Sequence, residues 1–302
     1  MTQYKENHES LRVGLVQLSS TPDNPPTLDR CIEAIKQAAR EGAKLVLLQE
    51  LHNTHYFCQT EDPEHFKFAE TIPGPSTDKL CKLAKDTSLV IVASLFEKRG
   101  TGLYHNTAVV IDSNGEIAGK YRKMHIPDDP GYYEKYYFAP GDMGFNPVQT
   151  SLGKLGVLIC WDQWFPEAAR LMTMAGADLL LYPTAIGWEP TDNKDKKSHQ
   201  FDAWQTVQRS HAICNGIPVM SCNRTGFEPV AEHSTRGIDF WGGSFVCDAQ
   251  GNILSEATYN KECVLLTDID MNATKKIRNE WPFLRDRRID AYSDLLYLFR
   301  DQ

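Results

Sequence analysis

The first part of the chain alternates short apolar runs with a segment of helical spacing. Residues 12–19 and 45–48 are apolar runs of strand length, and the second is apolar throughout, as in a strand buried on both faces. Between them, residues 27–41 place their apolar side chains at helical spacing, and Gly42 ends that helix. We therefore predict a strand–helix–strand unit at the start of the chain.

The same alternation continues further along, with two β-hairpins inserted. Apolar side chains at helical spacing predict helices near 77–84, after Pro166 and over 201–215. Polar, glycine-containing turns at 112–116 and 248–252 are typical of hairpin loops. Further strands are predicted at residues 89–96, 106–111, 117–122, 155–160, 178–182, 219–223, 243–246 and 263–268.

No change of composition divides the chain, so we predict a single domain over residues 1–302. Alternating strands and helices, together with two hairpins, indicate an α/β fold in which helices cover a mixed sheet system. The tail, residues 277–302, ends in an apolar stretch around 295–299 that predicts a terminal helix.

Charge and cysteine content narrow the classes of partner. The formal net charge is −8 without a basic cluster, which argues against nucleic acid or an anionic membrane and suits a cationic ligand. Apolar runs are too short to span a bilayer, and the polar start lacks the apolar core of a signal peptide. The eight cysteines are scattered without a C-x-x-C pair, so we expect reduced thiols and a cytoplasmic location.

Three polar side chains stand at the ends of three separate predicted strands, namely Glu50, Lys123 and Cys160. The carboxyl ends of strands are where α/β folds place their chemistry. Cys160 also precedes a helix that starts at Pro166, and the positive end of that helix favours a thiolate. Each side chain alone has a structural explanation, as a helix cap, a solvated charge or a core thiol.

Together, these three residues form the set that thiol-based acyl transfer requires. The carboxylate of Glu50 takes the thiol proton and the thiolate of Cys160 attacks. The ammonium of Lys123 then faces the oxyanion with help from the N–H of Trp161. A cysteine protease would need a histidine partner, and none of the nine histidines falls at a comparable strand end.

Several segments resemble those of one known family. Residues 48–50, 121–125 and 158–162 are similar to the three signature segments of the nitrilase (carbon–nitrogen hydrolase) superfamily. Residues 12–19 and 138–142 resemble its opening strand and its conserved loop. The resemblance covers nearly the whole chain, with the segments in the same order and at the same spacing.

This resemblance implies a fold and a site. The fold is a four-layer α-β-β-α sandwich without a metal or an organic cofactor. The site is a triad of Glu50, Lys123 and Cys160, assisted by Glu134 as a second carboxylate in the aromatic loop. The family's assembly through outer helices and the C-terminal tail implies a homo-oligomer built from dimers, up to an octamer, with residues 277–302 in subunit contacts.

The turn after the cysteine bears on the choice of substrate. Family members that act on amino-acid derivatives place an arginine there to hold the substrate carboxylate. Residues 161–165 carry no cation, so we expect a substrate without a carboxylate. Glu189 beside Trp188 suits an alkylammonium group, although a solvated loop acid is the alternative explanation. The other side chains that we assign to substrate binding are Tyr56, Trp161 and Trp164.

Residues 160–167 and 281–288 resemble N-carbamoylputrescine amidases of polyamine synthesis. This resemblance implies a small cationic ureido substrate, cleaved to putrescine, carbon dioxide and ammonia through a covalent thiol intermediate. Three alternatives stay open: another amidase or a ureidopropionase, a nitrilase, and a catalytically silent homologue that acts by binding. His52 and His55 could suggest zinc, but no third ligand stands at a recognisable spacing, so we expect an ordinary loop.

Overall fold

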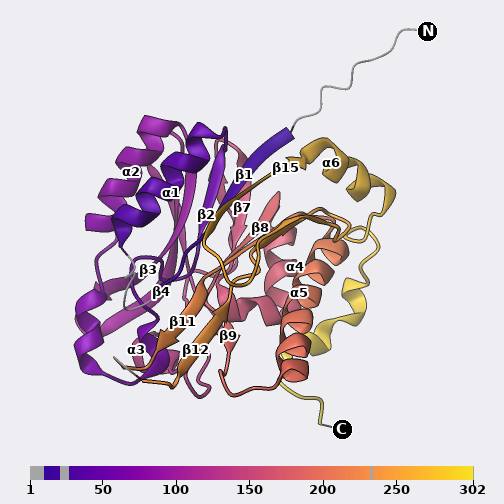
Figure 1. Cartoon of the computed structure of the whole chain (residues 1–302). Helices are drawn as coiled ribbons and strands as arrows, with labels where there is room; N and C mark the ends of the chain where they lie inside the picture. The colour runs from indigo at the N-terminus through magenta and orange to yellow at the C-terminus, as the bar shows by residue number, and fades with distance from the viewer. Residues whose placement is uncertain (1–9, 21–26, 232–233, 302) are drawn as a thin grey trace.

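Two six-stranded sheets lie face to face between pairs of helices in the computed structural model of the chain (Figure 1). The structure describes residues 10–20, 27–231 and 234–301. One sheet is covered by α1 (Leu28–Arg40) and α2 (Pro75–Thr87), the other by α4 (Pro166–Met174) and α5 (Lys194–Asn215). The four-layer α-β-β-α sandwich implied by the sequence resemblance is therefore confirmed.

The first sheet has the strand order β15-β1-β2-β3-β4-β5. Its centre is parallel, because β1, β2 and β3 are joined through helices, whereas β4, β5 and β15 pair antiparallel. The strands are β1 (Ser10–Gln17), β2 (Leu45–Leu48), β3 (Val90–Gly100), β4 (Leu103–Ile111), β5 (Ile117–Arg122) and β15 (Cys263–Asp270).

The second sheet has the order β14-β13-β10-β8-β7-β6. Here β7, β8 and β10 are the parallel centre, with antiparallel strands on both sides. The strands are β6 (Val148–Thr150), β7 (Gly153–Val157), β8 (Leu179–Thr184), β10 (Val219–Asn223), β13 (Phe245–Cys247) and β14 (Ile253–Glu256).

A three-stranded sheet of order β11-β12-β9 lies at the lower end of the sandwich in Figure 1. Its strands are β9 (Gly187–Trp188), β11 (Thr225–Pro229) and β12 (Gly237–Trp241), and α3 (Glu134–Tyr137) lies at the same end. Helix α6 (Met271–Glu280) follows β15 at the opposite end. Short 3₁₀ turns span Phe57–Gln59, Pro63–Phe68, Cys160–Trp164, Ile289–Ala291 and Ser293–Leu296.

The main core lies between the two sheets, and a second core lies under α1 and α2. All of β2 is buried, as its continuous apolar sequence predicts for a parallel strand covered on both faces. Within the described ranges, no helix is both long enough and apolar enough to cross a membrane.

Some boundaries differ from the sequence predictions. The strand before Cys160 ends at Val157, and Cys160 begins a 3₁₀ turn instead of closing the strand. Helix α5 begins at Lys194, where Asn193 caps it. The predicted start at 201 is seven residues too late, because the first two turns of the helix are polar and show no apolar spacing.

Helix α6 and the strands of the small sheet were not predicted from the sequence. The terminal helix predicted around 295–299 is wrong. That stretch holds only the 3₁₀ turn Ser293–Leu296, and its apolar side chains are exposed, so no packed face supports a helix.

Candidate active site

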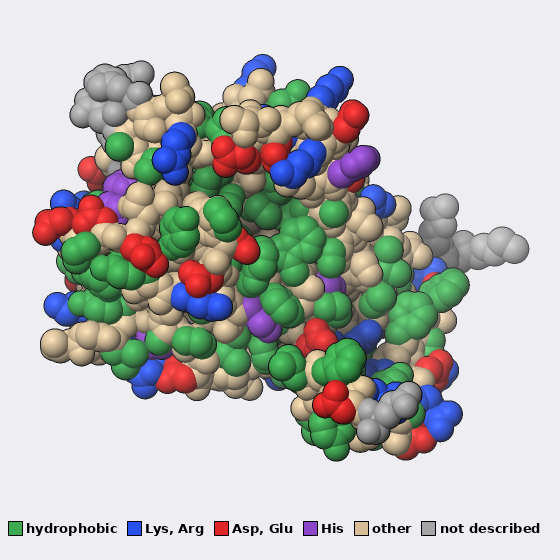
Figure 2. Space-filling view, turned by 90° about the horizontal axis from the view of Figure 1, so that it is seen from below, with side chains coloured by type: hydrophobic (Ala, Val, Ile, Leu, Met, Phe, Trp, Pro, Cys, Tyr) green, Lys and Arg blue, Asp and Glu red, His purple; other side chains and the backbone are tan. Residues whose placement is uncertain are grey.

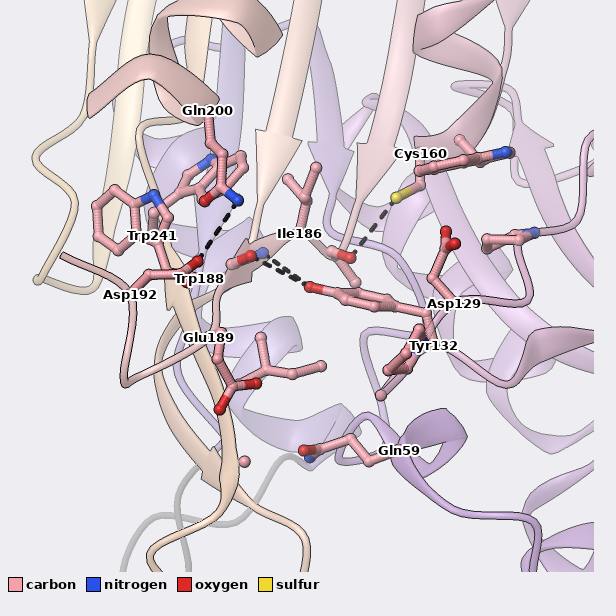
Figure 3. A pocket seen from close by; sticks show the side chains of 18 of the residues that line it. Gln59, Asp129, Tyr132, Cys160, Ile186, Trp188, Glu189, Asp192, Gln200 and Trp241 are labelled. Carbon is pink, nitrogen blue, oxygen red and sulfur yellow. Dashed lines mark hydrogen bonds between the residues drawn. The ribbon is translucent and has the colours of Figure 1, made fainter. Parts of the chain in front are cut away.

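A cavity of about 1310 Å³ opens where the central strands of both sheets end (Figure 3). Cys160 comes from the turn after β7, and residues 185–189, which follow β8, form part of the wall. The two sheets are joined here, because the N–H of Glu50, just after β2, donates to the carbonyl of Thr184 at the end of β8. This link places side chains from distant parts of the sequence around one pocket.

The nucleophile candidate sits on a strained turn. Cys160 has φ +44°, a left-handed conformation that costs a non-glycine residue about 1–2 kcal/mol. Its thiol is nearly buried and donates to the carbonyl of Ala185, with 3.6 Å between Sγ and O (Figure 3). Burial raises the pKa of this thiol well above its ordinary value, Glu50 adds to the rise and Lys123 opposes it. The resting thiol is therefore protonated and needs a base.

Glu50 has one carboxylate oxygen occupied and one unoccupied. Its Oε1 accepts from Asn106 Nδ2 at 2.7 Å and from Lys123 Nζ at 2.8 Å. Its Oε2 is buried and has no hydrogen-bond partner among the described residues. A buried acceptor without a partner is costly, and this one is free to receive a proton.

Lys123 follows β5 directly and is fully buried between two carboxylates. Its Nζ lies 2.8 Å from Glu50 Oε1 and 2.9 and 2.7 Å from the two oxygens of Glu134. Burial acts to lower the pKa of Lys123, but Glu134 and Glu50 together raise it well above its ordinary value. The side chain is therefore an ammonium at neutral pH.

Glu134 begins α3 and lies at the edge of the cavity. Burial raises the pKa of its carboxyl group, against the lowering effect of Lys123. The phenol of Tyr56 donates a hydrogen bond to Glu134 Oε1 at 2.8 Å and so supports this carboxylate. Tyr56 is fully buried and, like Glu50 and Lys123, is not part of the cavity wall; its phenol supports Glu134, and the substrate contact that we predicted for it stays a prediction.

Arg224 is a site residue that the sequence reasoning missed. It is fully buried, and its Nη2 donates to the carbonyls of Glu50 at 2.8 Å, Leu51 at 3.0 Å and Thr54 at 3.3 Å. It therefore holds the turn that follows Glu50. Arg224 stands directly after β10, just as Lys123 stands directly after β5. Its position at a strand end could have identified it from the sequence.

Arg224 is itself paired with a buried carboxylate. Its Nη1 lies 2.6 Å from Glu228 Oε1, and Glu228 Oε2 accepts from the backbone N–H of Tyr56 at 2.6 Å. Through Tyr56, this pair also reaches Glu134. A buried ion pair whose remaining donors and acceptors are largely satisfied can hold such a geometry rigidly.

The far side of the pocket carries Glu189 and Trp188, with Asp192 beside them (Figure 3). Glu189 is exposed, whereas the side chain of Asp192 is only 10% exposed and lies 2.6 Å from Lys196 Nζ. The indole of Trp188 already has a cation near it, because Lys197 Nζ lies 5.5 Å from the ring centroid. Trp161 and Trp164 line the same cavity as Cys160, as expected for its neighbours in the sequence.

Acidic side chains outnumber basic ones around the cavity. The acids at its rim are Glu61, Asp129, Glu189, Asp192 and Asp195, and the lysine and arginine side chains are Lys196 and Arg236. Seen from below, the molecule shows apolar side chains toward the middle of this face with charged ones around them (Figure 2). An apolar interior with an acidic rim is suited to a ligand with an alkyl chain and a cationic end.

The two histidines that could have suggested zinc have other contacts within the protein, His52 in the interior and His55 at the surface of the loop. Burial lowers the pKa of His52 to about 4, and its Nδ1 lies 2.9 Å from the carbonyl of Ser94. His55 is exposed, but its ring packs against His65 and Phe68, and this partial desolvation lowers its pKa to about 4. Across the described part of the chain, no group of three or more His, Cys, Asp or Glu side chains is arranged to hold a metal ion.

Comparison with known proteins gives consistent results. Residues 12–279 match the family model described as carbon–nitrogen hydrolase. The chain is 42% identical to N-carbamoylputrescine amidase of Solanum lycopersicum over 97% of both chains. It is 41% identical to citrullinase of Francisella tularensis, over 95% of this chain and 98% of that one. The crystal structure of a carbon–nitrogen hydrolase from Helicobacter pylori G27 shares 46% identity and a TM-score of 0.91, covering 96% and 100% of the two chains.

Proposed function

The chain belongs to the carbon–nitrogen hydrolase family, and on that premise we propose that it hydrolyses N-carbamoylputrescine to putrescine, carbon dioxide and ammonia. The observation that carries the chemistry is the buried group of Glu50, Lys123 and Glu134 beside Cys160, with one carboxylate oxygen left unpaired. The choice of substrate is supported by the acidic rim and by the similarity to the tomato amidase.

In the proposed reaction, Glu50 Oε2 takes the proton of the Cys160 thiol, and the thiolate attacks the ureido carbon. The positive charge of Lys123 and the N–H of Trp161 stabilise the oxyanion. The first nitrogen leaves with the proton that Glu50 had taken, which produces a covalent carbamoyl thioester. Glu50 then deprotonates a water molecule, which cleaves the thioester and regenerates the thiol. The carbamic acid that is released breaks down to the second nitrogen product and carbon dioxide, so that one water is consumed in the whole reaction.

Glu134 holds Lys123 in this scheme. It contributes two of the three short contacts to Nζ, so it keeps the ammonium charged and fixed while Glu50 cycles between its protonated and ionised forms. Tyr56 in turn fixes Glu134.

At the other end of the pocket, we assign the substrate ammonium to Glu189 and Trp188, with Asp192 contributing negative charge. The butyl chain lies along Tyr132 and Ile186, which stand between Cys160 and these acids (Figure 3). The Tyr132 hydroxyl fixes this wall, because it accepts from the N–H of Gly187 at 3.1 Å.

A ureido amino acid is the second candidate substrate. Arg236 and Lys196 line the same cavity and could pair with a carboxylate, and the similarity to a citrullinase is nearly as high. Against it, residues 161–165 provide no cation close to the nucleophile.

A substrate panel tests the proposal. Ammonia release is measured from N-carbamoylputrescine, citrulline, 3-ureidopropionate, a simple amide and a nitrile. We expect kcat/KM to be highest for N-carbamoylputrescine. Preference for citrulline would keep the mechanism and replace the substrate. A folded protein that is silent toward the whole panel would instead support the binding homologue.

We also propose a homo-oligomer built from dimers, with the tail 277–302 in subunit contacts. The tail side chains Leu296, Leu298 and Phe299 are 90%, 106% and 77% exposed, which is unusual for large apolar groups. Sedimentation of the full chain measures this assembly. A cytoplasmic location stays a prediction from the sequence.

A further inference from the structure

Asp162 is a fully buried carboxylate that receives four hydrogen bonds from two separate segments. Its Oδ2 accepts from the backbone N–H of Ile159 at 2.8 Å and from the hydroxyl of Tyr121 at 2.9 Å. Its Oδ1 lies 3.1 Å from the backbone nitrogen of His125 and 2.7 Å from His125 Nδ1. Nothing in the proposed chemistry of the pocket uses this carboxylate.

The four hydrogen bonds come from three residues, and two of these flank Lys123 in the sequence. Tyr121 is two residues before the lysine and His125 is two residues after it. The ring of His125 also stacks on Phe165, with 3.7 Å between ring centroids and 4° between planes. The segment that carries the ammonium is thus attached to the nucleophile's turn at both of its ends.

The third donor residue, Ile159, fixes the backbone next to Cys160. Ile159 directly precedes Cys160, whose positive φ has to be maintained by its surroundings. The hydrogen bond from the Ile159 N–H to the Asp162 side chain connects the residue before the turn Cys160–Trp164 to a residue within it. One carboxylate therefore holds the strained turn and the lysine segment at the same time.

We propose that Asp162 is a positioning residue that sets the placement of the Lys123 ammonium relative to the Cys160 sulfur. The inference rests on the proposed thiol mechanism but not on the identity of the substrate. A carboxylate is required because Asp162 is the acceptor in all four hydrogen bonds. An asparagine would turn an N–H toward the N–H of Ile159 or of His125, so one of the two attachments would be lost.

The test compares D162N with the native protein. The first measurement is the rate at which iodoacetamide alkylates Cys160, followed by mass spectrometry of its peptide across neutral and alkaline pH. The second measurement is kcat and KM for N-carbamoylputrescine. D112N is the matched control, because Asp112 also accepts from several backbone and hydroxyl donors, at Ser113 and Ser151, but on a hairpin away from the pocket.

We expect D162N to slow alkylation and to lower kcat, each by about 10- to 100-fold, the size of losing a hydrogen bond to a charged group. The alkylation profile should also move to higher pH, because a displaced Lys123 no longer favours the thiolate. KM should change much less, and D112N should behave as the native protein. A folded D162N with native alkylation rate, pH profile and kcat would overturn the proposal.

If D162N does not fold, Y121F removes one donor and leaves the carboxylate in place. We expect the same direction of change with a smaller size, and a folded Y121F with native alkylation and kcat would equally overturn the proposal. The alkylation measurement needs no substrate. A protein that alkylates as expected but ignores N-carbamoylputrescine would therefore refute the proposed function and leave the role of Asp162 standing.

Discussion

The floor and the mouth of the pocket are built in opposite ways. We call the buried group of Glu50, Lys123 and Glu134 the floor; its members are joined by contacts of 2.7–2.9 Å, and of the three Glu134 alone is part of the cavity wall. At the mouth, Glu189 is exposed, and Asp192 pairs with a lysine whose side chain is 58% exposed. Charges in a dry interior interact strongly and are costly to disturb, whereas exposed ones are screened by water and salt. We therefore expect the floor to determine the reaction and the mouth to adjust the choice of substrate.

The largest effect in this comparison should follow from changing Cys160, the proposed nucleophile beside the floor. We expect C160A to lose turnover by about 10⁴-fold or more, because the covalent step disappears. Its free energy of unfolding should change by only about 1 kcal/mol, since one buried sulfur is a small part of the core. Ammonia release and thermal unfolding measure the two quantities.

The matched control is C222A. Cys222 is also fully buried, and its thiol also donates to a backbone carbonyl, that of Val16, but it lies outside the pocket wall. C222A should keep turnover near the native level. Comparable activity in C160A and C222A would remove the thiol from the mechanism.

An intermediate effect is expected at Glu134, and it should depend on pH. Burial raises the pKa of this carboxyl group, so as pH falls Glu134 takes up a proton above the ordinary glutamate value of about 4.3 and releases Lys123. The native kcat/KM should accordingly fall on the acid side at a pH above that value. In E134Q, Glu50 remains as a single carboxylate beside Lys123, so the acid limb should move to lower pH while kcat falls by about 10- to 100-fold.

E97Q is the control for this pH profile. Glu97 is a buried glutamate that is paired with Arg122 and Lys120 outside the pocket, and side-chain hydrogen bonds from these partners lower its pKa to about 2 despite its burial. A folded E97Q should keep the acid limb of the native protein. An acid limb that stays in place in E134Q would show that another group controls it.

The same contrast explains which parts of the site could be predicted from the sequence. Glu50, Lys123 and Cys160 follow apolar strands, and strand ends of such folds gather at one edge, so their convergence could be expected. Asn106 and Asp162 could not be assigned, because nothing in the spacing shows that a side chain will accept or donate across two sheets. The hydrogen bond from Tyr56 to Glu134 could not be predicted for the same reason, since the two residues are 78 positions apart.

The alternation of strands and helices was predictable from periodicity and the four layers from the family resemblance, but the mouth was not. Strand β9 has two residues, and its partner β12 lies about fifty residues further along the chain. No hydrophobic pattern is measurable over two residues. In the tail, by contrast, a hydrophobic pattern was present but misleading. The apolar stretch at 295–299 predicted a helix, but its side chains are exposed.

The smallest effect is expected at Glu189, at the mouth. E189Q should raise KM for N-carbamoylputrescine by about 3- to 10-fold and leave kcat nearly unchanged, because an exposed ion pair or cation–π contact contributes only about 1 kcal/mol. The comparison variant is E61Q, which removes the same charge from another exposed acid of the rim. If Glu189 contacts the ammonium, E189Q raises KM more than E61Q does, and the difference persists at high salt. Equal increases that both vanish at high salt would mean that the rim attracts the cation by its overall charge and that Glu189 makes no specific contact.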